Sequence, residues 1–433
     1  MEIVLLSGGS GKRLWPLSND NRSKQFLKVL KHNNEYESMV QRVYRQINET
    51  FDNINITVST SISQKAILEK QLNNNIDIVC EPSRRNTFPA ILLSAAHLYL
   101  NKNVDLNETI TILPIDSYVE NTYFENLLNM DEIIKNNKAN ICLLGIKPTY
   151  PSEKYGYIIK KDKIEFKEKP NKELASEYIN QGALWNGGVF CLKLNYLIDY
   201  LKKSIEFNNY EDVINNFDKL EKTSFDYAVL EKEDNIDVIE YNGCWKDLGT
   251  WNTLTEEIEE KIGKVITSED CINTSVVNEL NIPVVALGLK DIIVATSPDG
   301  ILISNKDKSS HLNNYLDQVT DRIKYEERIW GKYVVLEETD KKLVKTLYID
   351  TGKNISYQKH AYRDEVWTIV SGNGIFVLDG EIKEVKENDV LFIPKGTKHG
   401  IKAIDDIELV EVQLGKNFVE DDIERFDYNW DEI

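Results

Sequence analysis

Apolar and polar positions alternate along residues 1–260 in the way expected of strands and helices that follow one another. Short apolar runs at residues 2–6, 54–59, 76–80 and 109–114 predict buried strands. Residues 36–47 and 88–100 have the composition and length of helices, and Asn86-Thr87 with Pro89 is a helix-start signal for the second of these. Strands that alternate with helices predict a mostly parallel, doubly wound α/β sheet of the Rossmann-like kind.

The pattern changes after residue 260. Short β-rich runs between residues 273 and 304 predict a small all-β segment, and the polar stretch 306–327 predicts a helical connector. From Arg328 onward, short apolar runs alternate with turns such as Asp379-Gly380, which predicts an antiparallel barrel or jelly roll. We therefore expect domains at 1–262 and 328–433, with the small β segment and helical connector at 263–327 between them.

Composition and charge exclude some classes of protein. A chain of 433 residues with 41% hydrophobic and 28% charged residues is long enough for two or three globular domains. Its net charge of −19 argues against a nucleic-acid groove, which needs surplus Lys and Arg to neutralise phosphates. A small phosphorylated ligand stays compatible with this charge, because a few local cations can hold it.

Cysteine usage and hydropathy point to a cytoplasmic protein without a membrane partner. The five cysteines are widely spaced and form no C-x-x-C pair, so neither a disulfide framework nor a Cys-rich zinc site is expected. The apolar residues 2–6 are too few for a secretory signal, and no run approaches the roughly 20 apolar residues of a membrane span.

A glycine-rich loop follows the first predicted strand, which ends near Leu6. Residues 8–13 read Gly-Gly-Ser-Gly-Lys-Arg. The glycines let backbone N–H groups approach phosphate oxygens, and Lys12 and Arg13 supply cations. The loop has the spacing of neither a P-loop nor a dinucleotide fingerprint. By itself it indicates only that a phosphate could bind here.

Further short motifs follow the loop in order. They are Lys24-Gln25-Phe26-Leu27, Glu81-Pro82-Ser83-Arg84-Arg85-Asn86-Thr87, Tyr155-Gly156-Tyr157-Ile158, Phe166-Lys167-Glu168-Lys169-Pro170, Leu184-Trp185-Asn186-Gly187-Gly188, Phe225-Asp226-Tyr227-Ala228 and Trp245-Lys246-Asp247-Leu248-Gly249-Thr250. Together with the loop, they resemble the sugar-nucleotide pyrophosphorylases, and most closely the bacterial mannose-1-phosphate guanylyltransferases. The resemblance covers most of residues 1–260.

This resemblance implies transfer of a nucleotidyl group from a nucleoside triphosphate, GTP, to a sugar 1-phosphate, mannose 1-phosphate. The products would be GDP-mannose, a precursor in polysaccharide biosynthesis, and pyrophosphate. The resemblance implies nucleotide binding by Leu6, Gly8, Gly9, Ser10, Gly11, Lys12, Glu81, Arg85 and Asn86, and sugar-phosphate binding by Gly156, Glu168, Lys169 and Asn186. The same chemistry with another base or sugar stays open, because no residue pattern fixes either.

The proposed reaction needs charge neutralisation, since both substrates are anions. Mg²⁺ prefers hard carboxylate ligands, and Asp116 and Asp247 are the two candidates. The family usually places His after the first of these residues, whereas Ser117 follows here. Arg13 and Lys24 are the expected catalytic cations, which stabilise charge developing on the α-phosphate. No covalent nucleophile is needed, because the sugar phosphate attacks in line.

Two later motifs carry possible metal ligands. His360-Ala361-Tyr362-Arg363-Asp364-Glu365 and Pro394-Lys395-Gly396-Thr397-Lys398-His399 resemble the two motifs of a cupin. They are similar to the mannose-6-phosphate isomerase domain fused to bacterial guanylyltransferases. The resemblance implies a divalent ion, Zn²⁺, Co²⁺ or Mn²⁺, held by His360, Glu365 and His399.

Two positions depart from the motif of the fused isomerases. Those proteins carry His where this chain has Tyr362 and Val366. We expect these replacements to weaken metal binding or to change the metal preference. The cupin is then either a second, isomerase site or a structural or regulatory module without catalysis.

A non-enzymatic sugar-nucleotide sensor is the alternative of a different class. The presence of Arg13, Lys24, Asp116, Lys169 and Asp247 favours the enzyme, because a sensor would be free to lose them. The expected partners are the two small-molecule substrates, without nucleic acid. A homodimer fits this architecture, but the sequence does not determine the oligomeric state.

Overall fold

The computed structural model describes residues 1–9, 11–73, 76–161, 164–416 and 418–430. The chain folds into two compact units, of which the first comprises Met1–Arg13 with Ser23–Glu259 and the second Leu14–Arg22 with Glu260–Ile433. The small β segment and the C-terminal barrel therefore belong to the same unit. Within the described residues, no helix has the length and apolar character needed to cross a bilayer.

The first unit is built on one nine-stranded sheet. Its strand order is β10-β9-β11-β6-β1-β4-β5, with β8 beside β11 and β12 beside β8. Strands β6, β1, β4 and β5 run parallel to one another, as do β8 and β12, whereas β11 is antiparallel to β6 and β8. The strands are β1 Glu2–Leu6, β4 Asn55–Ser61, β5 Asp77–Glu81, β6 Thr109–Pro114, β8 Ile141–Ile146, β9 Tyr157–Lys160, β10 Ile164–Lys167, β11 Leu184–Lys193 and β12 Ile236–Tyr241.

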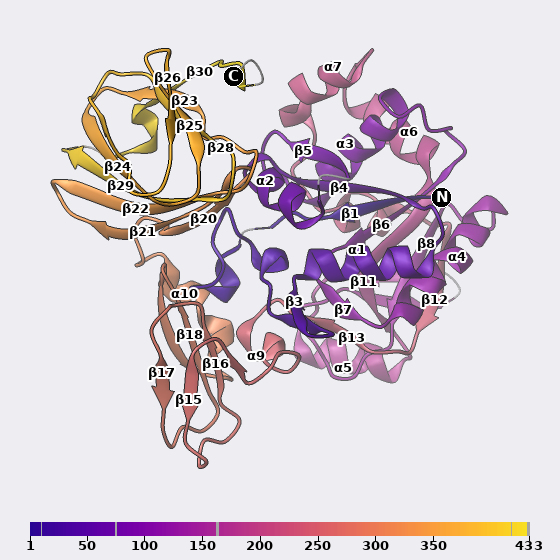
Figure 1. Ribbon diagram of the computed structural model, residues 1–433. Helices are drawn as coiled ribbons and strands as arrows, with labels where there is room; N and C mark the ends of the chain where they lie inside the picture. The colour runs from indigo at the N-terminus through magenta and orange to yellow at the C-terminus, as the bar shows by residue number, and fades with distance from the viewer. Residues whose placement is uncertain (10, 74–75, 162–163, 417, 431–433) are drawn as a thin grey trace. The chain divides into compact units, whose positions relative to one another are not determined.

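Helices cover both faces of this sheet (Figure 1). One face packs against α1 Met39–Thr50, α2 Ile62–Gln71, α4 Asn121–Lys135 and α5 Lys172–Asn180. The other face packs against α3 Thr87–Leu100, α6 Leu194–Ser204, α7 Tyr210–Asn215 and α8 Phe225–Ala228. This arrangement confirms the predicted doubly wound α/β fold.

Short elements complete the first unit. They are the 3-10 turns η1 Gly11–Leu14, η2 Lys24–Phe26, η3 Phe217–Lys219 and η4 Leu230–Lys232, the strand pairs β2 Leu30–His32 with β3 Glu35–Glu37 and β7 Ser117–Val119 with β13 Trp245–Asp247, and helix α9 Trp251–Leu254. Helix α3 begins as predicted, because the Asn86 side chain accepts a hydrogen bond from the Thr87 N–H. The helix expected over 36–47 begins only at Met39, after a capping box at Ser38.

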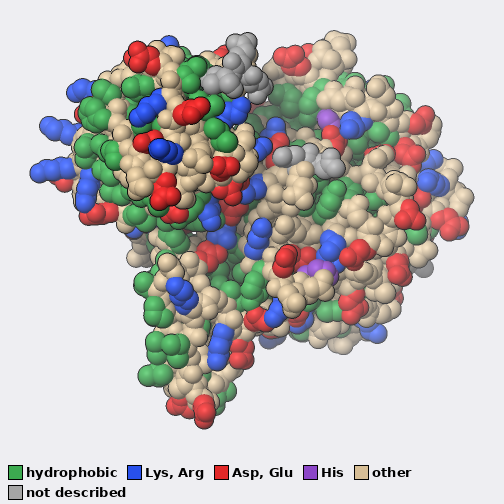
Figure 2. Space-filling view, viewed as in Figure 1, with side chains coloured by type: hydrophobic (Ala, Val, Ile, Leu, Met, Phe, Trp, Pro, Cys, Tyr) green, Lys and Arg blue, Asp and Glu red, His purple; other side chains and the backbone are tan. Residues whose placement is uncertain are grey.

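The small β segment consists of short strands stacked mainly in parallel. Its strands are β14 Lys261–Ile262, β15 Val265–Thr267, β16 Ser275–Asn278, β17 Val284–Ala286, β18 Ile292–Ser297 and β19 Gly300–Asn305. Strands β14, β16 and β18 pair in parallel, as do β15 and β17, and β19 returns antiparallel along β18. Its own core cluster of Val276, Ala286 and Val294 is small, and apolar side chains such as Val285 and Ile303 stay exposed. Figure 2 shows apolar side chains in green on the surface of this segment.

The helical connector predicted over 306–327 is mostly absent. The structure has only η5 Ser309–His311 and α10 Asn313–Leu316 there, and strand β20 begins at Tyr325. Ser, Asn and Asp side chains are frequent in this stretch, and they hydrogen-bond to nearby backbone groups in competition with a helix. The prediction was therefore wrong in extent.

The C-terminal region is a sandwich of two antiparallel sheets, which confirms the predicted cupin β-barrel. One sheet has the order β20-β21-β22-β29-β24-β27 and the other β26-β25-β28-β23-β30. The strands are β20 Tyr325–Arg328, β21 Gly331–Glu338, β22 Lys342–Ile349, β23 Tyr357–His360, β24 Arg363–Ser371, β25 Gly374–Leu378, β26 Glu381–Val385, β27 Val390–Ile393, β28 His399–Ala403, β29 Ile407–Gly415 and β30 Ile423–Phe426, with turn η6 Glu420–Asp422. Trp367 and Leu409 lie fully buried in the core of the sandwich.

Candidate functional site

A cavity of about 440 Å³ opens in the first unit, where β1, β4, β5 and β6 end. Parallel strands deliver their carboxyl ends to one edge of a sheet, which is where α/β folds bind ligands. The predicted nucleotide-binding residues among those lining the cavity are Leu6, Gly8, Gly9, Glu81, Arg85 and Asn86. The predicted metal ligand Asp116 lines the same cavity.

A lysine joins the two predicted metal ligands. Lys24 Nζ lies 2.7 Å from Asp116 Oδ2 and 3.4 Å from Asp247 Oδ1. Strand pairing explains the closeness of the carboxylates, because Asp247 on β13 is the register partner of Ser117, which directly follows Asp116. The structure thus brings together three residues that lie far apart in the sequence.

Electrostatics favour the charged forms of Lys24 and Asp116. Burial lowers the pKa of Lys24, but the two carboxylates outweigh it, so the lysine pKa is raised above its usual value. Burial likewise raises the pKa of Asp116, yet the Lys24 ammonium outweighs that effect and the pKa is lowered. Two partly exposed carboxylates held this close to one ammonium group are the kind of ligand pair that a hard divalent cation requires.

The glycine-rich loop borders this cavity at Gly8 and Gly9. Gly9 has φ 142°, a backbone conformation that residues with a Cβ rarely adopt. Gly11 is buried at the start of η1, and Lys12 and Arg13 are exposed. The predicted contact of Ser10 lies outside the described residues.

Glu81, the last residue of β5, and Arg85, in the loop before α3, differ in environment. Glu81 is buried in the cavity wall, and burial raises its pKa to about 7 against the opposing effect of Arg84. Arg85 donates to the Leu220 carbonyl at 2.9 Å and lies 3.5 Å from Asp218. Glu81 therefore presents an acceptor to the cavity, whereas Arg85 is partly engaged by its neighbours.

The four predicted sugar-phosphate residues form one connected group. A side chain at Gly156 would overlap Glu168 and Phe166, so only glycine fits there. Lys169 Nζ lies 2.5 Å from Glu168 Oε1, and the Asn186 N–H donates to the Gly156 carbonyl at 2.8 Å. Glu168 also lines a second hollow of about 390 Å³ beside α5.

Asp226 links this group to the larger cavity, and its role was not predicted. Its Oδ1 accepts a 2.7 Å hydrogen bond from Asn186, and its side chain lines the 440 Å³ cavity. Burial, reinforced by Glu168, raises its pKa to about 6. Asp226 lies in one of the motifs that carry the resemblance, but the sequence assigned it no role, because an acidic residue after the helix cap at Ser224 is equally typical of a simple N-terminal helix charge.

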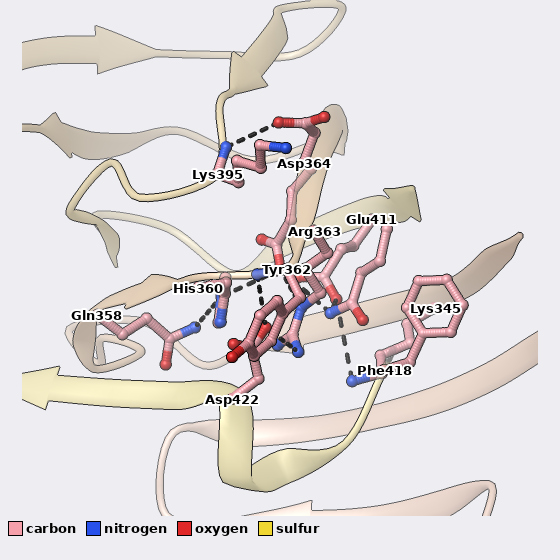
Figure 3. A network of polar contacts seen from close by, with 12 residues as sticks. Lys345, Gln358, His360, Tyr362, Arg363, Asp364, Lys395, Glu411, Phe418 and Asp422 are labelled. Atoms are coloured by element: carbon pink, nitrogen blue, oxygen red, sulfur yellow. Dashed lines mark hydrogen bonds and ion pairs between the residues drawn. The ribbon is translucent and has the colours of Figure 1, made fainter. Parts of the chain in front are cut away.

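The cupin contains a second cluster, and it is fully buried. His360, Glu365 and His399 offer ligand atoms that all lie within 4.8 Å of one another. Strands β23, β24 and β28 supply one residue each, and Figure 3 shows His360 among the polar side chains of this network. The structure thus brings together all three predicted cupin ligands.

Glu365 is the centre of this cluster. Its oxygens lie 3.1 Å from His360 Nε2 and 3.4 Å from His399 Nε2, and Arg363, Trp367 and Gln413 also donate to it. Burial would raise its pKa, but the two histidines outweigh burial and lower it well below the usual value. His399 Nδ1 lies 3.0 Å from the Thr397 carbonyl, which leaves Nε2 facing the cluster without a hydrogen-bond partner among the described residues. An orphaned buried nitrogen beside a carboxylate fits a metal ion.

The expected effect of Tyr362 and Val366 on metal binding stays a prediction, but the structure places neither side chain in the cluster. Tyr362 is 64% exposed. Side chains alternate along β24, so Arg363, Glu365 and Trp367 point inward and Val366 points to the opposite face. Neither replacement removes a side chain from the His-Glu-His cluster.

Gln358 lies next to the cluster and was missed. Its Nε2 is 3.4 Å from His360 Nε2, and its Oε1 accepts from Ser356. The signal was the period of two along a strand, which places a residue two positions before His360 on the same side. Turning the amide over would present its carbonyl oxygen to the histidine instead.

Comparison with known proteins matches both units. Residues 2–262 match the family model described as nucleotidyl transferase, and residues 317–428 match that described as mannose-6-phosphate isomerase C-terminal. A mannose-1-phosphate guanylyltransferase of Salmonella montevideo is 30% identical over 98% of both chains. A mannose-1-phosphate guanylyltransferase of Escherichia coli K12 is 28% identical, covering 98% of this chain and 97% of that protein.

Among solved structures, one of a protein from Thermus thermophilus is similar to about three quarters of the chain. It is titled mannose-1-phosphate geranyltransferase and is 25% identical, with a TM-score of 0.60. The match covers 74% of this chain and 99% of that one.

Proposed function

Because the chain belongs to the family of mannose-1-phosphate guanylyltransferases that carry a mannose-6-phosphate isomerase-type cupin, and is thus a nucleotidyltransferase, we propose that it transfers GMP from GTP to mannose 1-phosphate. The products are GDP-mannose and pyrophosphate. The observation that carries the proposal is the cluster of Lys24, Asp116 and Asp247 at the edge of the 440 Å³ cavity.

Asp116 and Asp247 are the proposed ligands of Mg²⁺. When bound, the ion would neutralise the phosphates of both substrates and stabilise the charge of the transition state. Lys24, which is held by both carboxylates, is close enough to move its ammonium group onto a phosphate oxygen. Arg13 adds a second, exposed cation at the end of the glycine-rich loop.

Nucleotide binding would use the backbone of the loop and one carboxylate. Gly8 and Gly9 leave their N–H groups accessible to phosphate oxygens. Guanine presents two neighbouring N–H donors on its Watson–Crick edge, and the Glu81 carboxylate is an acceptor buried in the cavity wall. Glu81 is therefore the proposed reason for a preference for guanine.

The sugar phosphate would lie against Gly156, Glu168, Lys169 and Asn186, next to Asp226. The carboxylates and the amide accept or donate hydrogen bonds to sugar hydroxyls, and Lys169 provides positive charge for the phosphate. With the two anions held in this way, the sugar phosphate oxygen attacks the α-phosphate in line and pyrophosphate leaves.

The cupin supports a second candidate function. We propose that His360, Glu365 and His399, with Gln358 as a fourth ligand, hold Zn²⁺, Co²⁺ or Mn²⁺. Such an ion would polarise a sugar carbonyl, which suits interconversion of mannose 6-phosphate and fructose 6-phosphate. The supporting observation is the buried Nε2 of His399, which has no hydrogen-bond partner among the described residues. Isomerase activity that depends on added metal would support this function, and metal content unchanged in a His360→Ala variant would exclude it.

A substrate panel tests the main proposal. Pyrophosphate release would be measured with each common nucleoside triphosphate and with mannose or glucose 1-phosphate, in the presence of Mg²⁺. We expect GTP with mannose 1-phosphate to react fastest, and Lys24→Met to lower kcat by roughly 10²- to 10³-fold. Glu81→Gln should reduce the difference in the rate of pyrophosphate release between GTP and ATP. Absence of turnover with every pair would contradict the enzyme and favour the non-enzymatic sensor.

A further inference from the structure

A nine-residue stretch of the N-terminal region does not belong to the unit that surrounds it in sequence. The chain leaves the first unit after Arg13, runs through the second unit from Leu14 to Arg22, and returns to the first unit at Ser23. We call Leu14–Arg22 the strap. Its position in the sequence is notable, because it directly separates the glycine-rich loop from Lys24.

Hydrogen bonds fix the middle of the strap to the small β segment. Ser297 Oγ donates to the Pro16 carbonyl at 2.6 Å. Asn19 Nδ2 donates to Asp299 Oδ2 at 3.0 Å, while the other oxygen of Asp299 accepts from the backbone N–H of Lys324 at 2.6 Å. Asp299 therefore ties the strap to the chain that leads into the cupin.

The Trp15 ring adds an apolar contact. Gly300 lies against this ring so closely that a Cβ there would overlap it, and its φ of 156° also disfavours other residues. The neighbouring Leu14 and Leu17 are almost completely buried. Packing and hydrogen bonding thus hold the strap along most of its length.

Arg22 is the strongest attachment. Its guanidinium forms two 2.9 Å hydrogen bonds to the two oxygens of Glu279, lies 3.8 Å from Glu327 and stacks 5.0 Å from the Tyr325 ring centre. The Arg22 side chain is only 9% exposed. Bidentate pairs between Arg and a carboxylate fix orientation as well as distance, and more firmly so when water is excluded.

The two proposed catalytic cations flank the strap in the sequence. Arg13 precedes the strap directly, and Lys24 follows Arg22 with only Ser23 between them. A residue of extended chain spans at most about 3.6 Å, so a shift of Arg22 by a few ångströms cannot be absorbed before Lys24. Ser23 has no freedom to absorb it either, because it is buried at the start of η2.

We propose that Arg22 is a positioning residue for nucleotidyl transfer: its ion pair with Glu279 fixes the strap, and the strap restrains Arg13 and Lys24 through the chain that joins them. The inference rests on the proposed function for its catalytic consequence. It gives the small β segment a role in the reaction, although the proposed substrate-binding residues all belong to the first unit.

A purely structural role for Arg22 makes a different prediction, and this separates the two. If the ion pair only stabilises the second unit, its loss should lower the melting temperature and leave kcat of the folded protein unchanged. If Arg22 positions the cations, kcat should fall while the KM for mannose 1-phosphate changes little, because Arg13 and Lys24 act on the charge of the transition state.

The variants are chosen within the second unit. Arg22→Met removes the bidentate pair, and Glu279→Gln weakens it while preserving shape. The double variant Arg22→Glu with Glu279→Arg restores the pair with reversed charges. Arg322→Met is the matched control, since Arg322 pairs with Glu338 at 3.0 Å and donates to the Phe418 carbonyl in the same unit.

We expect Arg22→Met to lower kcat at least tenfold, the double variant to recover most of it, and Arg322→Met to stay within twofold of wild type. Hydrogen exchange of the substrate-free protein is measured in parallel. Peptides covering residues 8–13 and 23–27 should exchange at least fivefold faster in Arg22→Met and unchanged in Arg322→Met. Equal kcat values and equal exchange rates in Arg22→Met and Arg322→Met would overturn the proposal.

The exchange measurement keeps this test separate from that of the proposed function. If wild type turns over no substrate pair, the proposed function fails, yet exchange at residues 8–13 and 23–27 still decides whether Arg22 positions them. If Arg22→Met does not accumulate as folded protein, Glu279→Gln carries the same comparison, with smaller expected changes in the same direction.

Discussion

The proposed chemistry depends on a few charged side chains, and these differ in how far neighbouring charges compensate them. Two carboxylates flank Lys24 in the absence of substrate, and they raise the pKa of this lysine, while its ammonium group lowers the pKa of Asp116. Glu81 has no such balance, and its pKa of about 7 reflects mainly its burial. The first arrangement is suited to exchange partners when a metal and phosphates arrive, and the second to accept donors from a ligand.

The Glu81→Gln variant should show how far the buried Glu81 carboxylate lowers the unfolding free energy of the substrate-free protein. A pKa raised to about 7 means that the folded protein binds this proton more tightly than the unfolded chain does. The stabilising contribution is therefore complete below about pH 4.5 and is lost as pH rises through about 7. We expect the unfolding free energy of the variant, relative to that of wild type, to rise by up to about 3 kcal/mol as the pH is raised from about 5 to about 8.

Urea unfolding of variant and wild type at the two ends of this pH range measures the gain in unfolding free energy. Glu132→Gln is the control, because Glu132 lies exposed on α4 and its replacement should change stability equally at both pH values. A gain for Glu81→Gln that shrinks as pH rises would contradict the assigned environment of Glu81.

At the scale of single elements, helix caps were readable from the sequence and strand partners were not. Asn86 and Thr87 correctly marked the start of α3, because capping is a local interaction. The pairing of β13 with β7, which brings Asp247 to Asp116, joins residues more than a hundred positions apart. Nothing in either three-residue strand specifies the other, so motif order suggested both carboxylates but could not place them together.

The cupin shows the same division between local and distant information. Alternation along β24 is local, and it explains why Glu365 points inward and Val366 outward. The expectation that Tyr362 and Val366 weaken metal binding came from the motif without regard to this alternation, and it stays a prediction. The strap was not predictable either, since its membership of the second unit rests on distant residues such as Glu279 and Asp299.

Helix α1 supports a prediction on local structure. Ser38 Oγ accepts from the Gln41 N–H, Gln41 Oε1 accepts from the Ser38 N–H, and Ser38 Oγ also donates to Gln71 at 2.6 Å. Ser38→Ala should therefore lower the unfolding free energy by about 1–2 kcal/mol. Ser204→Ala, which removes a hydroxyl exposed at the end of α6, should cost less than about 0.5 kcal/mol in the same denaturation experiment. Equal losses in the two variants would contradict the capping role.

At the scale of the whole molecule, the two units should respond to different ligands. A metal that binds only the folded cupin stabilises it by mass action, by about 2.7 kcal/mol at a hundred times the dissociation constant. We expect Zn²⁺ added to chelator-treated protein to raise the melting temperature of the second unit, as measured by calorimetry. Glu365→Gln should abolish this shift.

Tyr362→His provides the matched control for the metal site. Because Tyr362 is exposed, a histidine there should leave the zinc-induced shift as it is in wild type. A larger shift in Tyr362→His, or an undiminished one in Glu365→Gln, would contradict the ligand set proposed from the structure.

The central claim is that Asp116, Asp247 and Lys24 form a Mg²⁺-dependent centre for nucleotidyl transfer, and the Mg²⁺ dependence of pyrophosphate release tests it most directly. With GTP and mannose 1-phosphate, we expect wild type and Asp199→Asn, which changes an exposed carboxylate on α6, to be activated alike by Mg²⁺. Asp247→Asn should need far more Mg²⁺ and reach at most about a hundredth of the wild-type rate. Identical Mg²⁺ dependence in Asp247→Asn and Asp199→Asn would contradict the account.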